Sequence, residues 1–104
     1  MPNDIVVDLE TTGLNYNNTA IIQLAAVKFS LKDGTIEHDF FDRCLMIPPG
    51  RYWDEGTRDW WLKDNSKREV LQTILGRGED PLTVLKDFAA WVGPDAIFWA
   101  KPLS

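Results

Sequence analysis

Residues 5–14 have the sequence IVVDLETTGL, in which apolar residues lead into two carboxylates and a polar turn. Asp8 and Glu10 are one residue apart, and successive side chains of a strand point to opposite faces, so both carboxylates lie on one face. Hard cations such as Mg²⁺ bind oxygen and often take only one or two carboxylates plus substrate phosphates. The stretch therefore predicts half of a divalent-metal site at the carboxyl end of a buried strand.

Length and composition fit one small globular domain of 104 residues, 44% of them hydrophobic. The net charge of −5 argues against a generic phosphate-binding surface, although bound metal ions can supply positive charge. Cys44 is the only cysteine, which excludes an internal disulfide and favours a reducing, cytoplasmic location. Neither a secretory signal nor a membrane-spanning run is visible in the sequence, so no membrane association is predicted.

Three strands are predicted at residues 4–10, 20–30 and 35–43. The Asp-Gly pair at residues 33–34 favours a tight turn, so these strands form an antiparallel meander. A fourth strand at 96–100 follows a helical crossover and is predicted to lie parallel to the first strand and beside it. Its carboxyl end and the loop 101–104 would then reach the two carboxylates, where open α/β sheets bind ligands.

Three helices are predicted between the third and fourth strands. Thr57 caps a short helix that carries Trp60 and Trp61, and residues 66–69 form a capping box for a second helix that ends at Gly76 or Gly78. Asp80 and Pro81 begin the third helix. Its predicted core-facing stripe consists of Leu82, Leu85, Phe88, Ala89 and Val92.

The motif at residues 5–14, followed by a strand with the sequence IIQLAAV at 21–27, resembles the first motif of the DnaQ-like (DEDD) 3′–5′ exonuclease superfamily. The pair Trp60-Trp61 in a short helix after a long loop is similar to the RNase T-like and exodeoxyribonuclease VIII-like branch. The resemblance implies an α/β fold: a ribonuclease H-like mixed sheet of three antiparallel strands and one parallel strand, with flanking helices. It covers residues 5 to about 100, the N-terminal part of the family's domain, so residues 1–104 are expected to be a C-terminally truncated exonuclease domain.

The resemblance also implies a chemistry and a set of site residues. The family hydrolyses phosphodiesters from the 3′ end of single-stranded DNA or RNA with two Mg²⁺ or Mn²⁺ ions, which Asp8 and Glu10 would help to bind as catalytic ligands. The backbone at Thr11 and Thr12 would hold the terminal sugar, and Leu14 would pack against the terminal base. Gly13 in the same turn is also expected to be a substrate-binding residue. Three further residues have two interpretations each. Gln23 is either a polar residue near the 3′ end of the nucleic acid or a hydrogen-bonded polar residue at a strand edge. Trp60 and Trp61 either contact the substrate or line the core or a groove.

The family's second acidic motif should follow the fourth strand, where this sequence has Lys101-Pro102-Leu103-Ser104. Its third motif, a His shortly before an Asp, has no counterpart, and His38 in the third strand is predicted to be structural or at the surface. The chain is therefore expected to be an N-terminal fragment or a truncated phage or bacterial gene product, inactive alone and at most a weak metal binder. The alternatives are a non-catalytic 3′-end binding module and a structural remnant of a nuclease. The apolar edge at 96–99 predicts self-association, and the choice between DNA and RNA stays open.

Overall fold

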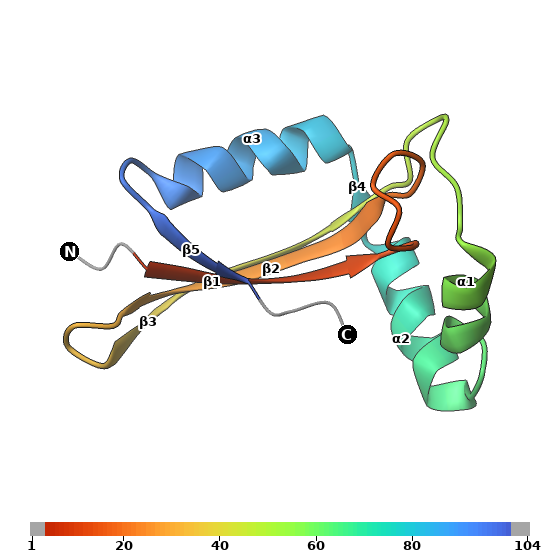
Figure 1. Cartoon of the computed structure of the whole chain (residues 1–104), viewed down its shortest axis with the longest axis horizontal. Helices are drawn as coiled ribbons and strands as arrows, with labels where there is room; N and C mark the ends of the chain where they lie inside the picture. The colour runs from red at the N-terminus through yellow and green to blue at the C-terminus, as the bar shows by residue number, and fades with distance from the viewer. Residues whose placement is uncertain (1–3, 101–104) are drawn as a thin grey trace.

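The structure, a computed structural model, describes residues 4–100, apart from the side chains of residues 37 and 38. In chain order the elements are β1 (Asp4–Thr11), β2 (Ile21–Ser30), β3 (Thr35–Leu45), α1 (Glu55–Trp61), α2 (Asn65–Gly76), β4 (Gly78–Glu79), α3 (Pro81–Val92) and β5 (Ile97–Ala100). The strands form one sheet in the order β4-β3-β2-β1-β5 (Figure 1). The predicted loop at 101–104 lies outside the described residues.

The sheet has the predicted mixed topology. β1, β2 and β3 are antiparallel neighbours, and β5 pairs in parallel with β1, with Asp4 opposite Ile97 and Val7 opposite Ala100. The two-residue strand β4 beside β3 was not predicted, because two residues carry no periodic pattern. Within the described residues β5 pairs only with the first half of β1, whereas β2 pairs with β1 along its whole length.

An ion pair fixes β4 against β3. Arg43 donates two hydrogen bonds to Glu79, from Nε to Oε2 at 2.7 Å and from Nη2 to Oε1 at 2.8 Å, and Nη2 also bonds Asp87 of α3 at 3.1 Å. These bonds lower the pKa of Glu79 and raise that of Arg43. The bidentate geometry holds the short strand in register with β3.

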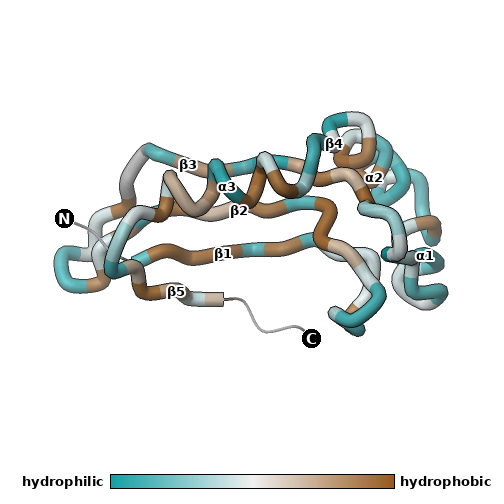
Figure 2. The backbone as a smooth tube through the Cα atoms, turned by 90° about the horizontal axis from the view of Figure 1, so that it is seen from above, coloured by the Kyte–Doolittle hydropathy of each residue, from teal (hydrophilic) through white to brown (hydrophobic). Residues whose placement is uncertain are grey.

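Helix α3 runs over β2 and β3 on one face of the sheet (Figure 2). The core between them consists of Ile5, Leu24, Ala26, Phe41, Leu45 and Val84. The third helix begins as predicted, with Asp80 as N-cap and Pro81 in its first turn. The predicted stripe was partly wrong, because Val84 is fully buried while Leu82 and Leu85 are 61% and 46% exposed. Apolar residues surround most of this helix, so packing against Phe41 and Leu24, and not periodicity, decides which of them face the sheet.

Helices α1 and α2 both begin at aspartates that the prediction overlooked. The Asp54 carboxylate accepts from the backbone N–H of Thr57 at 3.0 Å, and the Asp64 carboxylate accepts from that of Lys67 at 2.9 Å. Bonds from Lys67 lower the pKa of Asp64. The predicted Thr57 cap and the 66–69 capping box were therefore wrong, since a carboxylate that bonds the first turn also matches the positive end of the helix dipole.

A second core joins α1 and α2 to the ends of β2 and β3. It consists of Ile22, Cys44, Trp61, Leu71 and Ile74. Burial raises the pKa of the Cys44 thiol, which favours its protonated form. Within residues 4–100, no helix has the length and apolar character needed to cross a membrane.

Thr12 joins three parts of the chain, and we call its hydrogen bonds the Thr12 junction. Its N–H donates to the carbonyl of Ala20 and its Oγ1 accepts from the N–H of Ala20, both at 2.8 Å. Oγ1 also donates to the carbonyl of Tyr52, and the N–H of Asp54 donates to the Thr12 carbonyl, again at 2.8 Å. Thr12 has no exposed surface. The junction therefore sets where β1 ends relative to β2 and to the segment that leads into α1.

Replacing Thr12 by valine should lower the free energy of unfolding by about 2–4 kcal/mol, because the isosteric side chain leaves the buried N–H of Ala20 and the partly buried carbonyl of Tyr52 without partners. Urea unfolding followed by tryptophan fluorescence measures the change. Thr73→Val is the matched control, since the Thr73 hydroxyl also bonds a backbone carbonyl but is exposed. Equal stability of the two variants would contradict the importance of the junction.

Candidate active site

Asp8 and Glu10 lie on the face of the sheet opposite α3. Alternation along β1 turns Ile5 and Val7 toward the core under α3 and the two carboxylates the other way. Asp8 is exposed and Glu10 is partly buried. In the described part of the chain, no helix runs along this face, and α1 and α2 stand at its end (Figure 1). The two carboxylates therefore share a face, as predicted from their spacing.

Strand register adds a third carboxylate to this face. Asp8 pairs with Ala25 of β2, and Ala25 pairs with Asp42 of β3, so the three residues form one row across the sheet. The small Ala25 side chain leaves a hollow of about 350 Å³ between the two aspartates. Val6, Val27 and Phe40 form its apolar side. Asp42 was not predicted from the sequence, because its position beside Asp8 depends on the register of β3. The available signal was that Phe40, Asp42 and Cys44 lie two residues apart in one strand and therefore share a face.

Gln23 lies in the neighbouring row. It pairs with Glu10 on one side and with Cys44 on the other. Its Nε2 donates to Asp42 Oδ1 at 3.0 Å. The structure thus brings Gln23, a predicted site residue, beside Glu10, with its amide held by the third carboxylate.

In the turn after β1, the backbone at Gly13 packs closely against the side chains of Asp54 and Thr19. Thr11 Oγ1 donates to the carbonyl of Gly13 at 2.9 Å. A Cβ on Gly13 would lie 2.6 Å from Asp54 Cβ and 2.8 Å from Thr19 Cγ2, so only glycine fits this position. Thr12 is buried, with its N–H and carbonyl bonded inside the protein, whereas Leu14 is 69% exposed.

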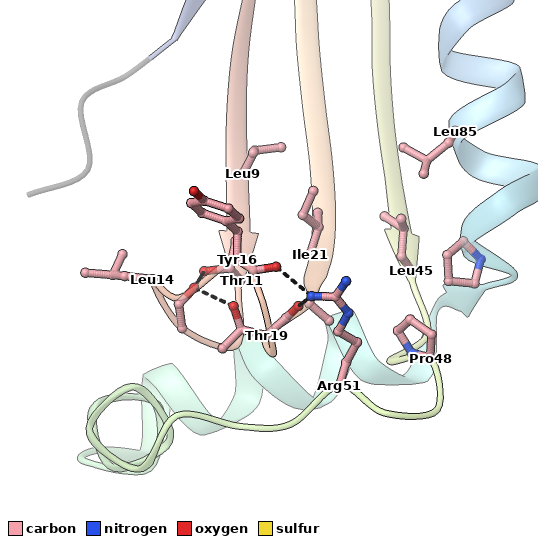
Figure 3. A pocket seen from close by; sticks show the side chains of 13 residues that line it. Leu9, Thr11, Leu14, Tyr16, Thr19, Ile21, Leu45, Pro48, Arg51 and Leu85 are labelled. Carbon is pink, nitrogen blue, oxygen red and sulfur yellow. Dashed lines mark hydrogen bonds between the residues drawn. The ribbon is translucent and has the colours of Figure 1, made fainter.

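The turn also lines a larger cavity of about 410 Å³ on the α3 side of the sheet (Figure 3). Its walls come from β1, β2, β3, α3 and the loops at 13–20 and 48–51, and we call it the Arg51 cavity after its charged residue. Thr11, Gly13 and Leu14 belong to this lining, whereas Asp8 and Glu10 do not. The structure therefore divides the predicted site residues between two faces, and the turn lies between them.

The two tryptophans of α1 have different environments. Trp61 is 4% exposed in the second core, and Trp60 is 51% exposed. Their rings meet edge to face, with centroids 5.0 Å apart, and Lys67 Nζ lies 5.1 Å from the centroid of Trp60. Helix α1 stands beyond the carboxyl end of β1 (Figure 1). His38 belongs to β3, as predicted.

The donor set fits a hard divalent cation. Asp8 and Glu10 offer oxygen ligands from one face, which suits Mg²⁺ or Mn²⁺ with the remaining ligands from water and substrate. Among residues 4–100 there is no group of three or more His, Cys, Asp or Glu side chains that could hold a metal ion. Asp8 and Glu10 are therefore the described carboxylates that could contribute part of a coordination shell.

Two solved nuclease structures share this fold. Cell-death related nuclease 4 (CRN-4) aligns with a TM-score of 0.58 and 17% identity over 86% of this chain and 29% of that one. The nuclease domain of 3′hExo, a DEDDh family member bound to rAMP, aligns with a TM-score of 0.58 and 16% identity over 95% of this chain and 50% of that one. The chain thus spans half or less of either structure. A search of curated proteins gives no match.

The predicted DnaQ-like exonuclease fold of the ribonuclease H-like type is confirmed by these structures. The family model described as the 3′–5′ exoribonuclease Rv2179c-like domain matches residues 3–102. The chain therefore belongs to the 3′–5′ exoribonuclease Rv2179c-like domain family.

Proposed function

We propose that this chain serves in metal-dependent hydrolysis of single-stranded nucleic acid from the 3′ end, with Asp8 and Glu10 as ligands of Mg²⁺ or Mn²⁺. The observation that carries the proposal is the placement of both carboxylates on the open face of β1, near its carboxyl end. Membership of an exoribonuclease family supports the reaction class and makes RNA the first substrate to test. The structural similarity to a nuclease domain bound to rAMP is consistent with it.

Each site residue then has a physical role. A bound divalent-metal pair activates water and stabilises the leaving oxygen in this chemistry. Asp8 and Glu10 would hold the metal, and its positive charge would offset the repulsion between two neighbouring ionised carboxylates. Gln23 adds a polar group beside Glu10. Thr12 acts indirectly, because its backbone groups are engaged in the Thr12 junction and fix the turn that presents Thr11.

Apolar and aromatic surfaces would hold the nucleic acid bases. The exposed side chain of Leu14 offers a surface for the terminal base. Trp60 exposes half of its surface and can stack on a base, which contributes about 1–3 kcal/mol. The buried Trp61 holds Trp60 by its edge-to-face contact and does not itself reach solvent.

A non-catalytic 3′-end binding module is the second candidate. It is favoured by the absence of a three-ligand metal group within residues 4–100, while Leu14 and Trp60 remain exposed for binding. A cytoplasmic location suits either function, since the single cysteine, Cys44, is buried and reduced.

The Asp8→Ala, Glu10→Ala double variant should lose the weak Mn²⁺ binding that we expect of the unmodified chain, because it removes both oxygen ligands. Electron paramagnetic resonance of free Mn²⁺ during titration measures the bound fraction. Asp59→Ala, at an exposed carboxylate on α1, is the control and should bind Mn²⁺ like the parent. Equal binding by the parent and the double variant would refute the metal site.

The 104-residue chain alone should release little or no mononucleotide from a 3′-labelled single-stranded RNA or DNA with Mg²⁺ or Mn²⁺. Two metal ions and a positioned general base supply most of this catalysis, the base alone about 10²–10⁴-fold. Residues 4–100 contain no group of three or more side chains that could hold a metal ion, so we expect little of this catalysis. Gel electrophoresis of the labelled strand measures cleavage, and filter binding measures retention. Metal-dependent release that Asp8→Ala abolishes would show a working enzyme and overturn the binding-only expectation.

Strand β5 should promote self-association. It lies at the edge of the sheet, and Ile97, Phe98 and Trp99 are 56%, 54% and 45% exposed, so its outer backbone groups and apolar side chains can pair with another copy. Light scattering should show association that grows with concentration and weakens in Phe98→Lys. The control is Leu62→Lys, at an exposed apolar residue outside β5, which should associate like the parent. A clean monomer of the parent at high concentration would contradict this expectation.

A further inference from the structure

We propose that the Arg51 cavity binds a small apolar monocarboxylate, which is a free organic acid with one carboxylate and a hydrocarbon or aromatic body. The carboxylate pairs with Arg51, and the apolar body covers the leucine and isoleucine side chains of the lining. This lining includes neither Asp8 nor Glu10. The inference is therefore independent of the metal site and of the proposed function.

The cavity offers an apolar surface of suitable size for such an acid. Its volume of about 410 Å³ falls within the range of small-ligand pockets. Leu9 of β1, Ile21 of β2 and Leu45 of β3 line it from the sheet, and Leu85 lines it from α3 (Figure 3). Leu9 and Leu85 are 37% and 46% exposed, so a bound apolar body removes part of their surface from water, which is favourable.

Arg51 supplies the only charge among the described residues of this lining. Its Nη1 donates to the carbonyls of Tyr16 at 2.6 Å and Thr19 at 3.2 Å, which holds the guanidinium in place. Figure 3 shows this group in the middle of the labelled side chains. A guanidinium has five N–H donors, so Nε and Nη2 are available to an anion. Their planar fork matches the two oxygens of a carboxylate.

The charge balance favours a ligand with a single negative charge. One guanidinium offsets one carboxylate, whereas a phosphate monoester carries about −1.5 to −2 at pH 7. The excess charge would lie against mostly apolar side chains, in a chain whose net charge is already −5. Placing an unpaired charge in apolar surroundings is costly. A monocarboxylate therefore fits this cavity better than a phosphate ester.

The threonines and the loop backbone around the cavity are already bonded within the protein. Thr11 Oγ1 donates to the carbonyl of Gly13 at 2.9 Å. The hydroxyl and the N–H of Thr19 both donate to the carbonyl of Asn15, at 2.6 Å and 3.0 Å. A peptide or another ligand with many polar groups would lose bonds to water there and find few partners in return. A ligand whose one polar group meets Arg51 avoids this cost.

Binding should also stiffen the contact between two loops. The Arg51 side chain joins its own loop to the loop at 13–20, and the N–H of the next residue, Tyr52, donates to the carbonyl of Asn18 at 2.8 Å. A ligand that binds the guanidinium stabilises this joined arrangement. Hydrogen exchange at the Tyr52 amide should therefore slow when the acid binds.

The test is a titration of the full chain, with ¹³C-labelled leucine and valine methyl groups, by 3-phenylpropionate in EDTA. The acid should shift the methyl signals of Leu9, Leu45 and Leu85. It should leave unchanged those of Val6 and Val27, which line the hollow on the opposite face. The uncharged 3-phenylpropionamide should bind about tenfold more weakly, because it lacks the charged pair with the guanidinium. Phenyl phosphate should also bind more weakly than the acid.

Three variants test the role of charge. Arg51→Gln should weaken the acid about tenfold and the amide little. Arg58→Gln removes an exposed guanidinium of α1 and should bind both like the parent. Because Arg51 also holds the 13–20 loop, a pair of substitutions at the half-exposed Leu85 gives a second measurement. Leu85→Lys and Leu85→Glu lose the same apolar surface, and the acid should bind the lysine variant about fivefold more tightly.

Four results would each overturn the proposal. They are equal affinity of the Arg51→Gln and Arg58→Gln variants for the acid, equal affinity of the two Leu85 variants for it, methyl shifts confined to Val6 and Val27, and tighter binding of phenyl phosphate than of the acid. A peptide with a carboxyl-terminal phenylalanine is the last probe. Binding of this peptide tenfold tighter than the free acid would show a peptide site and overturn the assignment to a small acid.

Discussion

The saturated hydrogen bonding of Thr12 is the constraint on which the candidate site depends. Every polar atom of this fully buried residue has a partner: Ala20 just before β2, and Tyr52 and Asp54 in the segment before α1. The hydroxyl accepts from the N–H of Ala20 and donates to the carbonyl of Tyr52 where β1 leaves the sheet. The same bonds bring Asp54 to the place where it caps α1. One residue thus positions the end of the strand that carries Asp8 and Glu10, the turn with Leu14 and the helix with Trp60.

The two faces of the sheet carry different kinds of side chain. One face carries the core under α3, and the other carries a row of carboxylates spaced by Ala25. Alternation alone produces this division, since each apolar residue of β1 that enters the core turns its neighbour outward. The turn at Gly13 is where the two faces meet. The Arg51 cavity, whose lining includes Gly13, and the hollow between Asp8 and Asp42 carry charged residues of opposite sign.

The sequence allowed a good prediction of the meander, of the parallel fourth strand and of Asp8 and Glu10 on one face, because these depend on local periodicity and on handedness. It did not allow a prediction of Asp42, whose place beside Asp8 depends on the register of two further strands. The face of α3 was partly mistaken for a similar reason. Leu82 and Leu85 are as apolar as Val84 and Phe88, and only packing on β3 decides between them. The helix caps at Asp54 and Asp64 were visible in the sequence, but a nearby Thr and a capping box competed for the same role.

The span of the Thr12 junction has a consequence for the order of folding. The hydroxyl of Thr12 and the carbonyl of Tyr52 are 40 residues apart in the chain, whereas β1, β2 and β3 follow each other through short connections. Closing so long a segment costs more chain entropy than forming a hairpin, so we expect the meander, with the two bonds between Thr12 and Ala20, to form before the bonds of Thr12 with Tyr52 and Asp54. The path of the chain from the turn into α1 would then be fixed later than the turn itself.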